Sequence, residues 1–121
     1  MSEIYLDDDS IPMWVRIEEG MRMLDLAIRE AKERGRKMVD KEVEYYAVKA
    51  KVSYRMLEAG YANTYIQTVI KGQPEVAAAM GEYHAADVEY KNANEAIQAY
   101  KLKLRIMEAE NEREHEQARR M

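Results

Sequence analysis

Apolar residues recur along most of this chain at alternating steps of three and four residues, the spacing of one face of an α-helix. The first such stripe follows Ser10 and Pro12, which suit the cap and the first turn of a helix. Its members are Trp14, Ile17, Met21, Leu24, Ile28 and Ala31. Gly35 predicts the end of this helix. A kink at Gly35, with the helix continuing past it, is the alternative.

A second helix is predicted from Asp40, a capping residue, to about residue 59, with Gly60 ending it. This helix carries two neighbouring apolar stripes. One consists of Val43, Tyr46, Ala50, Tyr54 and Leu57, and the other of Tyr45, Val48, Val52 and Met56.

Residues 63–72 are ambiguous. Thr64 and Gln67 have capping-box spacing and Gly72 suits a helix end, yet most of the apolar residues between them favour strands. We predict a short helix, because a lone strand would have no sheet to join.

The longest element is predicted to begin at Pro74 and reach about residue 115. Its first stripe is an unbroken seam of coiled-coil type: Val76, Ala79, Tyr83, Ala86, Tyr90, Ala93, Ile97, Tyr100, Leu104 and Met107. A second stripe consists of Ala85, Val88, Asn92, Ala96, Ala99, Leu102 and Ile106. Such a helix spans roughly 50 Å over residues 75–108, beyond the ~30 Å of a compact domain. We therefore expect its far end to project or to pack on another chain. The candidate oligomer seam is Tyr83, Tyr90, Ile97, Tyr100, Leu104 and Met107.

Together these elements predict an all-α protein, a helical hairpin or bundle in which one long C-terminal helix (about 74–115) packs on two shorter helices. A single helical domain is expected over residues 10–110, followed by a charged, fraying helix extension over residues 111–121. Residues 1–9, which include three consecutive aspartates, are interpreted as a flexible acidic tail. The alternative is a docking segment that Ile4 and Leu6 anchor onto a neighbour.

Composition excludes several kinds of chemistry. The chain has no Cys, which rules out disulfides, thiolate catalysis and Cys-based metal sites. His84 and Asp87 share a helical face but are too few ligands for a zinc site, and no phosphate loop or nucleophile motif is present. We predict no enzyme activity, no cofactor, no metal and no small-molecule substrate. The N-terminus does not resemble a signal peptide, and nothing approaches a transmembrane stretch, so a cytoplasmic protein without membrane contact is expected.

The net charge is -4, but cations gather around the predicted break between the first two helices. They are Arg29, Lys32, Arg34, Arg36, Lys37 and Lys41. Beside Tyr45, Tyr46 and Tyr54 this patch has the ingredients of a site for single-stranded DNA or another anionic partner. Acidic residues lie among the cations, so a solvated face with i,i+4 ion pairs is the alternative.

The stretch from Val76 to Tyr83, then Asp87–Tyr90, and the run from Ala96 to Glu108 resemble small helical proteins of tailed bacteriophages, encoded among early recombination and replication genes. The plan of an acidic start, a Tyr- and Ala-rich helix and a long last helix is similar to the recombination mediators of T-even-like phages. The resemblance covers about residues 40–110. It implies a ring- or bundle-forming oligomer that contacts single-stranded DNA and a recombinase.

We therefore expect a non-enzymatic, oligomerising helical accessory protein, phage-encoded, that mediates recombination or replication on single-stranded DNA. A homo-oligomer with a further protein partner is expected. The alternatives are a phage inhibitor that binds a host defence protein and a structural or virion-assembly protein.

Overall fold

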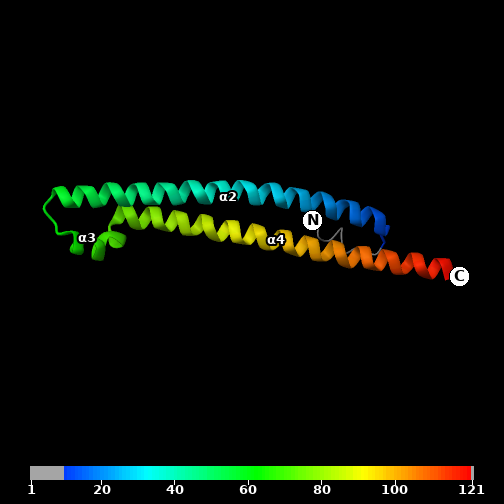
Figure 1. The fold of residues 1–121 in the computed structure, drawn as a ribbon. Coiled ribbons are helices and arrows are strands. Elements are labelled where there is room, and N and C mark those ends of the chain that lie inside the picture. Colours follow the sequence, from blue (N-terminus) through cyan, green and yellow to red (C-terminus); the bar gives the residue numbers. More distant parts are fainter. Residues whose placement is uncertain (1–9, 121) are drawn as a thin grey trace. The chain divides into compact units, whose positions relative to one another are not determined.

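The structure is a computed structural model of the 121-residue chain and describes residues 10–120. The elements in this range are α2 (Met13–Glu58), α3 (Asn63–Val69), the 3-10 helix η1 (Ile70–Gly72) and α4 (Pro74–Arg120) (Figure 1). The long helices α2 and α4 pack as a hairpin, and the short α3 and η1 lie in the connection between them. The predicted all-α class and hairpin are confirmed. The interpretation of residues 1–9 as a tail or docking segment falls outside the described residues.

One helix, α2, stands where two shorter helices were predicted, so the predicted break between Gly35 and Asp40 is wrong. Gly35 lies inside the helix, where an added Cβ would be 3.0 Å from Cε1 of Tyr90 on α4. This glycine therefore serves the close approach of an aromatic ring and does not end the helix. One glycine inside a helix costs about 1 kcal/mol relative to alanine. The helix continues past Gly35 because the Lys, Arg and Glu residues around it are good helix formers.

The uninterrupted α2 also changes the expectation for the last helix. Because α2 has 46 residues and α4 has 47, α4 has a partner of its own length within the chain. The length of α4 by itself therefore does not require a second chain.

Gly60 ends α2 as predicted. It has a positive φ of 96°, and the amides of Gly60 and Tyr61 donate to the carbonyls of Leu57 and Met56. This is the Schellman pattern, which needs a residue that adopts the left-handed region without strain.

The short helix predicted within residues 63–72 is confirmed, but the capping box is not. The residue at its N-cap is Ala62, with no side-chain cap hydrogen bond. The hydroxyl of Thr68 donates to the carbonyl of Thr64 at 3.0 Å instead.

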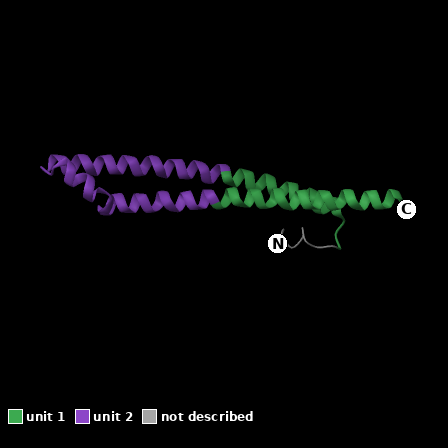
Figure 2. Ribbon diagram, turned by 60° about the horizontal axis from the view of Figure 1, so that its bottom comes forward, with its two compact units in different colours: residues 1–31, 92–121 green, residues 32–91 purple. Residues whose placement is uncertain are grey.

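The chain divides into two compact units (Figure 2), and each has its own core. Unit 2 comprises residues 32–91, and unit 1 comprises the parts of the chain up to residue 31 and from residue 92. The core of unit 2 draws on every element of the hairpin: Tyr45, Val52, Ile66, Ile70, Val76 and Ala79. Its most enclosed side chains are Ile66 from α3, Val52 from α2 and Val76 from α4, each less than 2% exposed.

Unit 1 has a smaller core, built on Leu104 and Met107 of α4. Met13, Ile17, Leu24 and Tyr100 pack against these two residues. An added Cβ at Gly20 would lie 2.8 Å from Cδ2 of Leu104, so the absence of a side chain at Gly20 lets Leu104 approach α2.

The first predicted stripe of α2 is wrong at two positions. Trp14 is 67% exposed and Met21 is 55% exposed, while the neighbouring Arg16 and Gly20 are buried. Glycine counts as neutral in a hydrophobicity pattern, so the pattern predicts that the larger apolar residues nearby form the buried face. Because Leu104 of α4 packs closely against Gly20, the face of α2 that carries Gly20 is the buried one.

Candidate interaction surfaces

The inner face of α4 carries the residues that the sequence put forward as an oligomer seam. Leu104 and Met107 are buried in the core of unit 1, and Tyr100 packs against them. In unit 2, the rings of Tyr83 and Tyr45 stack with centroids 6.0 Å apart, and Tyr90 lies against Gly35. Ile97 is half-buried. These contacts cover most of the predicted seam within the chain.

The hydroxyl of Tyr83 donates a hydrogen bond to Oε2 of Glu42, at 2.7 Å, and so ties α4 to α2 in unit 2. This hydrogen bond raises the pKa of Tyr83 to about 12, helped by desolvation and by the charge of Glu42. The bond favours the protonated phenol because a phenolate facing a carboxylate would be repelled.

The predicted cationic patch divides into paired and unpaired members. Arg34 and Lys37 both lie within ion-pair distance of Glu89 on α4, at 3.1 and 3.5 Å. Lys41 contacts Glu82 of α4 at 3.1 Å and Glu44 at 3.3 Å. Its hydrogen bonds to Glu82 and Glu44 raise the pKa of Lys41. Half of the predicted patch therefore binds the acidic flank of α4.

The other three cations of that patch are exposed: Arg29, Lys32 and Arg36. Within the described residues none of these three lies in an ion pair. Lys32 and Arg36 belong to unit 2, and Arg29 belongs to unit 1.

The outer α2 stripe is an exposed apolar surface of unit 2. It consists of Val43, Tyr46, Ala50, Tyr54 and Leu57, one of the two stripes that the sequence showed on this helix. Its four large side chains are between 53% and 66% exposed. The other stripe, with Tyr45 and Val52, lies in the core. In unit 2, α2 is therefore apolar on two opposite faces, of which only the inner one is covered within the chain.

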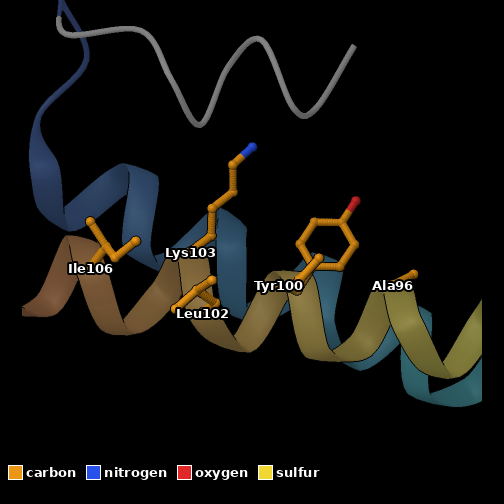
Figure 3. A pocket seen from close by; sticks show the side chains of 6 residues that line it. Ala96, Tyr100, Leu102, Lys103 and Ile106 are labelled. Carbon is orange, nitrogen blue, oxygen red and sulfur yellow. The ribbon is translucent and has the colours of Figure 1, made fainter.

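A second apolar surface, the α4 groove, lies in unit 1. Its lining consists of Ala96, Ala99, Tyr100, Leu102, Lys103 and Ile106, around a volume of about 290 Å³ (Figure 3). Leu102 is 56% exposed and Ile106 is 50% exposed. Most of this lining belongs to the second stripe that the sequence showed on the last helix. The predicted oligomer seam lies on the first stripe instead, and hydrophobic spacing alone does not show which stripe the chain itself covers.

Within residues 10–120, no three His, Cys, Asp or Glu side chains gather as a metal site would require. In the same range no helix has the length and apolar character needed to cross a membrane. Comparisons with protein-family models, with curated proteins and with solved structures find no match for this chain.

Proposed function

We propose that this chain is a non-enzymatic helical accessory protein that works by assembly, in which a second copy binds along the outer α2 stripe. The symmetry of the stripe about Ala50 carries the proposal. Tyr46 and Tyr54 lie four residues on either side of Ala50, and Val43 and Leu57 lie seven residues on either side. The spacing of the stripe is therefore the same in both directions along the chain.

Such a stripe is complementary to itself about a two-fold axis, which is the usual symmetry of homodimers. If the axis passes Ala50 and the two α2 helices run antiparallel, Tyr46 meets Tyr54 of the second copy. Val43 then meets Leu57 of the second copy. The small Ala50 at the centre allows close approach of the two helices, and the tyrosines supply most of the contact area. Tyrosine is enriched in such interfaces because its ring is apolar and its hydroxyl can stay at the wet rim.

The same axis also has a cost. Lys51 is exposed and adjoins Ala50, so the two copies place their Lys51 side chains on the same flank of the interface. Like charges at the rim repel, and salt screens them over a Debye length of about 8 Å at physiological ionic strength. We therefore expect the dimer to become tighter as salt is added.

The test is the mass in solution, measured by sedimentation equilibrium over a range of concentrations. The unaltered chain should be a dimer, and Ala50→Glu should be a monomer because it buries two carboxylates at the axis. Ala78→Glu is the matched control: Ala78 is exposed on α4, so this variant should remain a dimer. A monomeric unaltered chain, or a dimeric Ala50→Glu variant, would contradict the proposal.

Because the chain has no cysteine, single cysteines report the orientation of the pair. Ala50→Cys lies at the proposed axis and should form a disulfide between copies, which requires Cα atoms within about 7 Å. Val43→Cys should form none with itself, but should cross-link to Leu57→Cys when the two variants are mixed. Self-cross-linking of Val43→Cys would show a parallel pair instead.

A second candidate function, mediation of recombination or replication on single-stranded DNA, is favoured by one feature. Lys32 and Arg36 are exposed, and their helical spacing places them on the face of α2 that carries Tyr46 and Tyr54. Cations beside aromatic rings suit a single strand. The ion pairs of Arg34, Lys37 and Lys41 count against this function, because they neutralise half of the cationic patch.

Fluorescence anisotropy with a labelled single-stranded oligonucleotide tests this second function. Binding should weaken with salt and should be lost with Lys32→Ala and Arg36→Ala together. Lys71→Ala with Lys101→Ala, which removes two exposed cations elsewhere, should bind almost unchanged. Absence of binding at low salt would rule out this function and leave the assembly proposal intact.

A further inference from the structure

A hollow in unit 2, the Gly35 pocket, lies outside the stripe that the proposed dimer uses. Its volume is about 390 Å³, and small-molecule sites usually measure roughly 300–1,000 Å³. The residues that line it are Gly35, Arg36, Met38, Val39, Asp40 and Tyr90. The first five belong to α2 and Tyr90 belongs to α4, all within unit 2. The pocket is therefore complete within one unit.

The missing side chain of Gly35 makes room for the apolar part of the pocket. An added Cβ at Gly35 would lie 3.0 Å from Cε1 and 3.4 Å from Cζ of Tyr90, so the aromatic ring sits against the backbone of α2. Met38 and Val39 line the same hollow, and Val39 is 51% exposed. A flat apolar group suits this lining, because it can pack on the ring of Tyr90.

Two opposite charges line the same pocket. Arg36 and Asp40 are exposed and stand one helical turn apart, a rise of about 6 Å. Among residues 10–120, neither of them takes part in an ion pair, with each other or with a third residue. The neighbouring Lys37 and Lys41 do contact glutamates of α4. The pocket therefore presents a guanidinium and a carboxylate that lack a charged partner.

We propose that the Gly35 pocket binds a free α-amino acid with a flat apolar side chain. The α-carboxylate of the ligand pairs with Arg36, whose planar guanidinium matches it in two hydrogen bonds. The α-ammonium pairs with Asp40, and the side chain lies against Tyr90 and Val39. The two charged groups of an amino acid share one carbon, and a charge-assisted hydrogen bond at each adds about 2.8 Å. Together they span the distance of one helical turn.

A peptide segment fits the same pocket less well than a free amino acid. Inside a peptide the amine and the carboxyl group are amides, so neither carries a charge for Asp40 or Arg36. A chain terminus carries only one of the two charges. A ligand with a single charge leaves the other side chain of the pocket without a partner.

Saturation-transfer NMR on the full chain, titrated with L-tryptophan, tests the proposal. The expected dissociation constant is about 1 mM, the order that ordinary ligand efficiency gives for a molecule of this size. Indole-3-propionate lacks the ammonium group and tryptamine lacks the carboxylate. Each should bind about fivefold more weakly, because an exposed ion pair contributes a factor of up to about five.

Two variants assign the charges of the ligand to the two side chains. Arg36→Gln should weaken tryptophan and indole-3-propionate about fivefold and leave tryptamine unchanged. Asp40→Asn should weaken tryptophan and tryptamine and spare indole-3-propionate. The matched control is Lys71→Gln with Glu58→Gln, which removes one exposed cation and one exposed carboxylate elsewhere in unit 2 and should change none of the three affinities. Circular dichroism of the same samples shows that the helices remain folded.

Equal affinities of the unaltered chain for the three ligands would overturn the proposal, since the charges would then play no part. Absence of saturable tryptophan binding would overturn it as well, and so would binding that Arg36→Gln and Asp40→Asn leave unchanged. None of these outcomes bears on the dimer, because the outer α2 stripe contains no residue of the pocket.

Discussion

Units 2 and 1 are built from the same two long helices, yet their cores differ. In unit 2, α3 and η1 contribute Ile66 and Ile70, and the side chains at the centre are almost completely enclosed. In unit 1, whose described residues contribute α2 and α4 but no third helix, Leu104 and Met107 keep 7% and 6% of their area exposed. Two helices cover only one stripe on each other, so full enclosure requires a third element.

In unit 2, polar groups join the long helices. Tyr83 binds Glu42, and ion pairs link Lys41 to Glu82 and Arg55 to Glu75. In unit 1, the contact between the long helices includes apolar packing and the close approach that Gly20 allows. The bond between Tyr83 and Glu42 should make unit 2 respond to pH, and the close packing at Gly20 should make unit 1 respond to changes in side-chain volume.

The largest expected effect comes from Ile66→Ala in unit 2. Ile66 is 1% exposed and enclosed on all sides, so the variant should leave a cavity and lose about 4 kcal/mol of the free energy of unfolding. Leu104→Ala in unit 1 should lose about 2 kcal/mol, because two helices without a third can close partly on the space. Urea denaturation followed by circular dichroism measures both losses. The control is Ile106→Ala at a half-exposed position, with a change below about 1 kcal/mol. Equal losses at Ile66 and Leu104 would mean that the third element adds no enclosure.

The next effect concerns glycines inside the long helices. Gly20→Ala must displace Leu104, and overpacking costs ~1–3 kcal/mol against a gain of about 1 kcal/mol in helix propensity. We expect a net loss of about 1 kcal/mol in the same assay. Gly81→Ala should instead gain up to about 1 kcal/mol, because nothing lies within 4 Å of the added Cβ. A stabilising Gly20→Ala would show that unit 1 is loosely packed at this point.

The smallest effect is a pH dependence in unit 2. The pKa of Tyr83 is about 12 in the folded chain, against an ordinary value of 10.0. Between these values the folded state holds a proton that the unfolded state has released, so stability falls as pH rises through this window. Below the ordinary value the contribution is fully present. Tyr83→Phe should therefore show a shallower loss of stability in this window than the unaltered chain, by urea denaturation at several pH values. Tyr65→Phe is the control, at an exposed position that does not influence Tyr83, and should keep the full slope. Equal slopes for all three proteins would show that Tyr83 does not cause the decline.

The amino-acid sequence determined the helical class, the turn at Gly60, the short helix after it and the start of the last helix at Pro74. These features depend on local chemistry: the three-four spacing of apolar residues, a glycine that accepts a positive φ, and a proline in the first turn. The sequence also showed two apolar stripes on each long helix. It did not show which stripe the chain covers, because both have the same period.

The tertiary structure decides which of the two stripes is covered. Gly20 and Gly35 face inward because Leu104 and Tyr90 approach them from α4, a contact between residues far apart in the sequence. The predicted cationic patch is half neutralised for the same reason, since Glu82 and Glu89 lie opposite Lys41 and Arg34 only when α4 packs in this register. Local spacing specifies each helix, whereas the register between helices specifies which residues remain exposed.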